Sequence, residues 1–161
     1  MRVPKLVEEK IVYADPEGRF YFLEHTGDIY VKAVGGDILE LLENAGIALF
    51  ESMVDTKSVR PVLERGVSAE GFDLENLLYR WLEALLTVYY SERIMCGDLE
   101  VHKLEIERRD NELNYRVSGR CVGEVFDPTL HEGRVEVKAV TYSLMRILKD
   151  DKWTAYFVLD I

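Results

Sequence analysis

The sequence predicts a single α+β domain, with a mainly antiparallel or mixed sheet packed with two amphipathic helices. Its β-rich stretches cluster instead of alternating strictly with helices, which argues against a doubly wound parallel sheet. Two other stretches carry apolar residues at helical spacing, each behind an aspartate that can cap a helix. A length of 161 residues with 48% hydrophobic residues suffices for one core. We therefore expect an N-terminal extension over residues 1–18 and one domain over residues 19–161.

The first third of the chain predicts strands followed by a helix. Residues 1–18 end in the turn signal Asp15-Pro16-Glu17-Gly18 and are interpreted as an appendage or an edge strand. The β-rich run over residues 20–34 predicts two short strands hinged at Thr26-Gly27-Asp28. A helix is expected from Asp37 to about Val54, with Asp37 placed to cap its first turn.

The rest of the chain predicts five β-rich segments and a second helix. Asp73 can cap this helix, which we expect to end near Tyr90. Asp110-Asn111 predicts a hairpin turn. The final run is expected to form a central strand. The expected β-rich segments are Val62–Glu70, Leu99–Glu107, Glu112–Gly119, Val135–Ile147 and Trp153–Ile161.

Charge and composition restrict the classes of partner that the chain is expected to bind. Lys and Arg total 20 against 30 Asp and Glu, and the net charge of −10 would repel nucleic acid phosphates, so direct nucleic acid binding is not expected. The same field could favour a basic partner or a cation, or serve solubility alone. Cys96 and Cys121 are too few for a disulfide framework and are expected as free buried thiols. Without an apolar run of about 20 residues or a secretory signal, we expect no membrane association and a cytoplasmic location.

The sequence lacks the common enzyme motifs. No nucleophile elbow, Walker loop, dinucleotide fingerprint, H-E-x-x-H or Cys/His cluster occurs. His25, His102 and His131 are far apart in the sequence, and each is interpreted as a structural residue instead of a zinc ligand. We therefore predict that the chain is not an enzyme with its own nucleophile.

Two aspartates at the ends of apolar strands are candidate metal ligands. Asp28 follows the hinge glycine, and Asp160 ends the last apolar run. A carboxylate at such a place is costly to bury unless it is paired or coordinates a cation. Ile161 would add a main-chain or terminal carboxylate oxygen as another hard donor. The alternative, that both aspartates are simply solvated, is left open.

Four motifs in order give the chain a family resemblance. They are Phe22-Leu-Glu-His-Thr-Gly-Asp28, Leu74-Glu-Asn-Leu-Leu-Tyr-Arg-Trp-Leu-Glu83, Gly123-Glu-Val-Phe-Asp-Pro-Thr-Leu-His131 with Glu136-Val-Lys-Ala-Val-Thr-Tyr142, and Phe157-Val-Leu-Asp-Ile161. From about Phe20 to Ile161 the chain resembles the archease family.

This resemblance implies a function and a site. Archeases are accessory proteins of RtcB-type tRNA-splicing RNA ligases, promoting their guanylylation and repeated rounds of RNA joining. The family's metal site matches Asp28, Asp160 and Ile161, with calcium the usual ion. Lys138 matches the lysine of the E-V-K-A motif, and either reaches a partner carboxylate or a nucleotide phosphate or forms only a surface ion pair.

Two departures and two alternative functions accompany the resemblance. Gly27 replaces a frequent Ala, which is harmless, and Ser143 stands where many members have His, which puts an imidazole role there in doubt. The alternatives are a metal-dependent phosphoester hydrolase, with Asp28 and Asp160 holding a cation that activates water, and a general chaperone.

Overall fold

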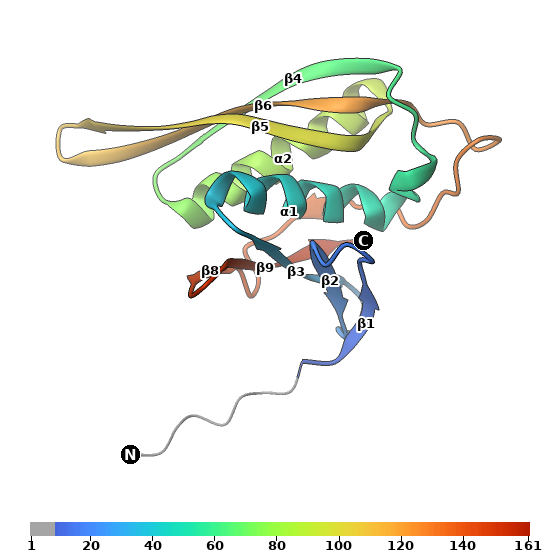
Figure 1. The fold of residues 1–161 in the computed structure, drawn as a ribbon, viewed down its shortest axis with the longest axis horizontal. Helices are drawn as coiled ribbons and strands as arrows, with labels where there is room; N and C mark the ends of the chain where they lie inside the picture. The colour runs from blue at the N-terminus through green and yellow to red at the C-terminus, as the bar shows by residue number, and fades with distance from the viewer. Residues whose placement is uncertain (1–8) are drawn as a thin grey trace.

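Two antiparallel sheets enclose two helices in a computed structural model that describes residues 9–161. Figure 1 shows both helices lying between the sheets. Residues 1–8, the first part of the predicted extension, lie outside the described residues. The predicted α+β class is confirmed. No helix within residues 9–161 is both long and apolar enough to cross a membrane.

The first sheet is built from both ends of the described chain. Its order is β1-β2-β3-β9-β7, and β8 also pairs with β9. The strands are β1 (Ile11–Ala14), β2 (Phe20–Leu23), β3 (Ile29–Gly35), β7 (Ala139–Val140), β8 (Arg146–Lys149) and β9 (Trp153–Asp160). The last strand is therefore central, as predicted, because it pairs with β3 on one side and with β7 and β8 on the other.

The second sheet contains a long hairpin. Its order is β4-β6-β5, with β4 (Leu63–Gly71), β5 (Ile94–Arg109) and β6 (Glu112–Val125). Asp110 and Asn111 connect β5 to β6 with φ angles of 48° and 66°, the left-handed backbone that tight hairpin turns require. The predicted hairpin is confirmed, and its strands are longer than predicted because the pairing continues to Ile94 and Val125.

Both predicted helices are present, with the predicted caps. The Asp37 carboxylate accepts a hydrogen bond of 2.8 Å from the Glu40 N–H at the start of α1 (Ile38–Met53). At the start of α2 (Leu74–Glu92), the Asp73 carboxylate accepts one of 2.7 Å from Asn76. In each case, the side chain satisfies a backbone N–H that lacks a partner within the helix.

The core lies between the helices and the inner faces of the two sheets. Its largest fully buried side chains include Trp81, Phe50 and Phe157, from α2, α1 and β9. The Trp81 indole N–H donates a hydrogen bond of 2.9 Å to the Leu42 carbonyl, so the ring is buried without an unsatisfied donor.

Two predictions are wrong. The stretch Val135–Ile147 is not one strand: only β7 and the start of β8 are extended, and Leu144 adopts a left-handed φ of 57° between them, which breaks the strand. Cys96 and Cys121 are not free thiols but form a disulfide. The pairing of β5 with β6 brings their Cα atoms within 5.3 Å, a distance that a disulfide can span.

Candidate functional site

Asp28 and Asp160 lie at the same end of two neighbouring strands. The antiparallel register of β3 and β9 pairs Ile29 with Leu159. Asp28 directly precedes Ile29 and Asp160 directly follows Leu159, so the two aspartates occupy the next position along this register. The pairing of β3 with β9 therefore brings together two aspartates that are more than a hundred residues apart in the sequence.

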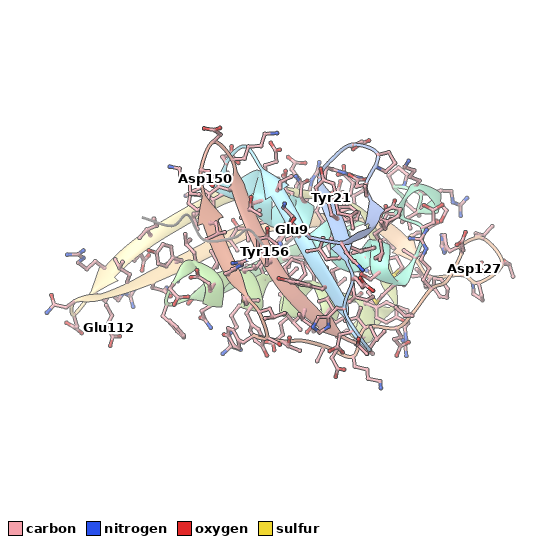
Figure 2. The ribbon with its side chains drawn as sticks, turned by 90° about the horizontal axis from the view of Figure 1, so that it is seen from below. Glu9, Tyr21, Glu112, Asp127, Asp150 and Tyr156 are labelled. Atoms are coloured by element: carbon pink, nitrogen blue, oxygen red, sulfur yellow. A yellow bond between two sulfur atoms is a disulfide. The ribbon has the colours of Figure 1, made fainter. Side chains whose placement is uncertain are left out.

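The alternation of side chains indicates which face of the sheet the pair shares. Val31 on β3 and Phe157 on β9 are fully buried against the helices. Side chains two residues apart share a face of a strand, so Asp160, Tyr156 and Lys32 lie on the opposite, outer face. Asp28 continues the same alternation just beyond the start of β3. Figure 2 views the molecule from this side, with Tyr156 labelled on the sheet.

The two carboxylates have no partner within residues 9–161. Both residues are half-buried, and neither side chain forms an ion pair or a hydrogen bond there. No group of three or more His, Cys, Asp or Glu side chains in this part of the chain could hold a metal ion. An ion bound here would therefore need main-chain oxygens or water in addition to the two carboxylates.

Ile161 and Lys138 meet the same strand end through the backbone. Ile161 follows Asp160 and is half-buried. The Lys138 N–H donates a hydrogen bond of 2.7 Å to the Asp160 carbonyl oxygen. No ion pair joins the Lys138 ammonium to a carboxylate of the described residues, so the surface ion pair considered from the sequence is not formed there.

Lys138 also lines a groove beside α2. This groove has a volume of about 250 Å³ and includes Tyr79, Leu86 and Tyr90 of α2 opposite Val140 of β7. The Tyr90 hydroxyl donates a hydrogen bond of 2.6 Å to the Val137 carbonyl, which holds the backbone before Lys138 against the helix. Lys138 thus borders two features, the end of β9 and the groove beside α2.

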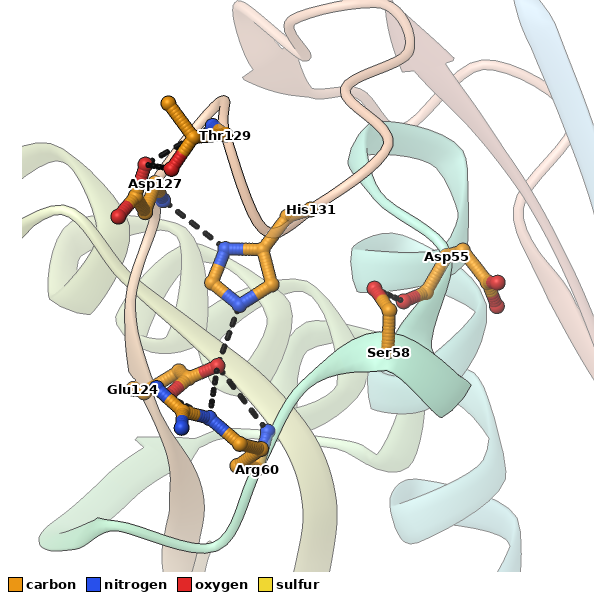
Figure 3. Close-up of polar contacts among 7 residues, drawn as sticks. All are labelled: Asp55, Ser58, Arg60, Glu124, Asp127, Thr129 and His131. Carbon is orange, nitrogen blue, oxygen red and sulfur yellow. Dashed lines mark hydrogen bonds and ion pairs between the residues drawn. The ribbon is translucent and has the colours of Figure 1, made fainter.

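Sequence reasoning missed a buried His131–Glu124 pair. Figure 3 shows the His131 ring between Asp127 and Glu124. Its Nδ1 accepts a hydrogen bond of 2.9 Å from the Asp127 N–H, so the ring proton lies on Nε2, which donates to the Glu124 carboxylate. The Arg60 guanidinium also donates to this carboxylate at 3.0 Å. Hydrogen bonds from His131 and Arg60 hold the pKa of Glu124 below its ordinary value, despite an opposing effect of burial.

These contacts give His131 a structural role. They tie the turn over residues 127–131 to β6 and to the segment after the short helix η1 (Thr56–Ser58). Further along, the Arg134 guanidinium donates a hydrogen bond of 2.8 Å to the Glu51 carbonyl at the end of α1. The segment that leads to Lys138 is thus anchored at several points. Glu124 and His131 both belong to the third motif, but only the fold shows that they touch.

Comparisons with known proteins agree on one family. The family model "Archease protein family (MTH1598/TM1083)" matches residues 20–161. "Protein archease" of Sulfurisphaera tokodaii is 44% identical over 144 residues, covering 89% of this chain and 99% of that protein. "Protein archease" of Thermococcus gammatolerans is 42% identical over 145 residues, with the same coverage. "Protein archease-like" of Drosophila melanogaster is 34% identical over 152 residues, covering 91% and 92%.

A solved structure has the same fold. The solution structure of protein 1598 of Methanobacterium thermoautotrophicum superposes with a TM-score of 0.69 at 36% sequence identity. The match covers 89% of this chain and 99% of that one.

Proposed function

The chain belongs to the archease family, and from this we propose that it is a metal-binding accessory protein of an RtcB-type tRNA-splicing RNA ligase. It promotes guanylylation of the ligase and so allows multiple turnover in tRNA splicing. The observation that carries the proposal is that the family match extends from Phe20 to Ile161, because it includes both of the neighbouring strand ends at which Asp28 and Asp160 lie.

The proposed metal site consists of Asp28, Asp160 and the main-chain oxygen of Ile161. These donors are all oxygens, which suits Ca²⁺ or another hard divalent cation. Asp28 and Asp160 occupy neighbouring register positions and have no cationic partner in residues 9–161, so a divalent cation would relieve the repulsion between their carboxylates when these approach each other. When bound, the cation would let a nucleotide phosphate or a partner carboxylate approach this acidic surface.

In this proposal the protein assists chemistry that occurs on its partner. The ligase supplies the nucleophile and binds the RNA, which accords with a net charge of −10 on this chain. Lys138 is the proposed partner-activating residue. Its exposed ammonium has no carboxylate partner among the described residues and is available to a phosphate or a carboxylate of the complex.

Labelled GTP and the cognate ligase test the proposal. Adding this protein should increase the rate at which label becomes attached to the ligase. Asp28→Asn, Asp160→Asn and Lys138→Met should each weaken this effect while leaving the unfolding temperature close to that of the unsubstituted protein, since none of the three side chains is in the core.

Two exposed residues provide matched controls. Asp150→Asn removes a carboxylate from the turn between β8 and β9, and Lys57→Met removes a cation from η1. Both should stimulate like the unsubstituted protein. Label on this chain, or an unchanged ligase rate, would contradict the proposal. Phosphoester cleavage by the chain alone would favour the hydrolase, and suppression of the aggregation of unrelated proteins would favour the chaperone.

A further inference from the structure

The outer face of the first sheet carries a row of aromatic and cationic side chains. In the register of the sheet, Tyr21 of β2 lies beside Lys32 of β3, Lys32 beside Tyr156 of β9, and Tyr156 beside Arg146 of β8. The four residues therefore form one line across four strands. Neither helix covers this face, because α1 and α2 both lie on the other side of the sheet (Figure 1).

The cations lie on the tyrosine rings. The Arg146 guanidinium carbon is 4.4 Å from the centroid of the Tyr156 ring. The Lys32 ammonium is 5.9 Å from the Tyr21 centroid and 5.8 Å from the Tyr156 centroid. These are distances at which a ring face attracts a cation. A chain with a net charge of −10 thus places two positive groups together on this face.

A carboxylate of the chain itself occupies this row. The Lys32 ammonium donates a hydrogen bond of 2.8 Å to one oxygen of Glu9, and the Tyr156 hydroxyl donates to the other. Partial burial would raise the pKa of Glu9, but these two donors and the charges of Lys32 and Arg146 lower it below its ordinary value. Figure 2 shows Glu9 and Tyr156 close together on this face. The row is therefore built to receive a carboxylate.

Glu9 reaches this position from the far edge of the sheet. It precedes β1, and the order β1-β2-β3-β9 places two strands between β1 and Tyr156. Within residues 9–161, the Glu9 side chain forms hydrogen bonds with Lys32 and Tyr156, and the adjoining backbone is held by a bond of 2.8 Å from the Glu24 N–H to the Lys10 carbonyl. Because these contacts are few, another carboxylate can replace that of Glu9 without disturbing the strands.

We propose that Lys32, Tyr156 and Arg146 form a binding site for an acidic side chain of a protein partner, and that Glu9 occupies this site until the partner displaces it. The identity of the partner rests on the proposed function, which makes it an acidic segment of the ligase. The position supports this choice, because the row lies on the same face of β3 and β9 as Asp28 and Asp160, four register positions away. A partner that docks on the row therefore also reaches the proposed metal site.

A peptide titration tests the site without the ligase. The probe is N-acetyl-hexaglutamate amide at low ionic strength, and binding is followed by the NMR shifts of amides in β3 and β9. Glu9→Gln should tighten binding about five-fold, because it removes the internal competitor. Glu24→Gln is the matched control, since Glu24 is exposed and pairs with Lys10 at 3.5 Å instead of with the row, and it should leave the affinity unchanged.

Removing the cationic side chains should reverse the gain in affinity for the peptide. In the Glu9→Gln background, Lys32→Gln should weaken peptide binding about five-fold or more. Arg146→Gln, at an exposed position, gives an independent check should Lys32→Gln disturb the strand. Equal affinities for Glu9→Gln and Glu24→Gln, or undiminished binding after loss of both cations, would overturn the proposal.

A ligase titration then separates the site from the proposed function. Glu9→Gln should lower the protein concentration that gives half-maximal stimulation of guanylylation, and Lys32→Gln should raise it. If the unsubstituted protein does not stimulate the ligase, the proposed function fails, and the peptide titration alone decides whether the carboxylate site exists. If stimulation occurs but neither variant changes it, the ligase is not the partner of this face.

Discussion

Replacing Gly71 by Ala should destabilise the protein through a clash with a helix backbone. Gly71 ends β4, two residues before the cap of α2. A Cβ on Gly71 would lie 2.5 Å from the backbone nitrogen of Leu77, which is about 0.9 Å closer than ordinary contact. A Cβ on Gly35, two residues before the cap of α1, would meet the backbone nitrogen of Leu41 at the same 2.5 Å. Both helices thus press onto the glycine that ends the preceding strand.

The expected cost of Gly71→Ala is about 2 kcal/mol. Overpacking costs about 1 to 3 kcal/mol, and the upper end applies because the obstacle is helix backbone, which cannot turn aside as a side chain can. Restricting the unfolded chain returns about 0.4 to 1 kcal/mol. For a protein of this size, the net loss corresponds to a fall in the unfolding temperature of about 4 to 8 °C.

Gly66→Ala in the same strand is the control. A Cβ there has no neighbour within 4 Å, so the substitution should leave stability unchanged or raise it slightly. Thermal and guanidinium unfolding of both variants, followed by circular dichroism, provides the comparison. If the midpoints of the two variants agree within about 1 °C, the close approach of β4 and α2 does not limit stability, and the reasoning fails.

Three further predictions concern covalent and polar contacts. Reduction of the Cys96–Cys121 disulfide, which spans a sequence separation of 25, should lower stability by about 3 kcal/mol, whereas a double Ala variant should unfold at the same temperature with or without dithiothreitol. Asp15→Asn should lower the unfolding temperature at pH 7. Burial alone would raise the pKa of Asp15, but hydrogen bonding to Arg19 lowers it in the folded state. The ionised Asp15 carboxylate therefore stabilises the fold, and its contribution is complete above the unfolded pKa of about 4. It should be lost as the pH falls through the folded-state value, and a variant difference that persists undiminished at pH 2 would contradict this. For His131, ¹⁵N NMR near pH 7 should show a protonated Nε2 and an unprotonated Nδ1, and the reverse tautomer would show that the ring does not accept the backbone hydrogen bond.

Local signals in the sequence were enough for the helices and the hairpin. Asp37 and Asp73 cap helices whose apolar spacing is visible in the sequence, because capping and helical periodicity involve residues within a few positions of one another. The Asp110-Asn111 turn marks the hairpin for the same reason. The error over Val135–Ile147 arose because β propensity alone does not provide a pairing partner, and only parts of that stretch reach β9.

The chain's sequence by itself determined the fold class, the two capped helices, the family and the identity of the candidate residues. Only the tertiary structure decided that Asp28 and Asp160 end adjacent strands on one face, that Cys96 and Cys121 are joined, and that Glu9 sits on Lys32 and Tyr156. The physical reason is the range of the interactions. Caps, turns and helical spacing act between near neighbours in the chain, whereas strand register and cross-sheet contacts depend on which distant segments bury their apolar faces together.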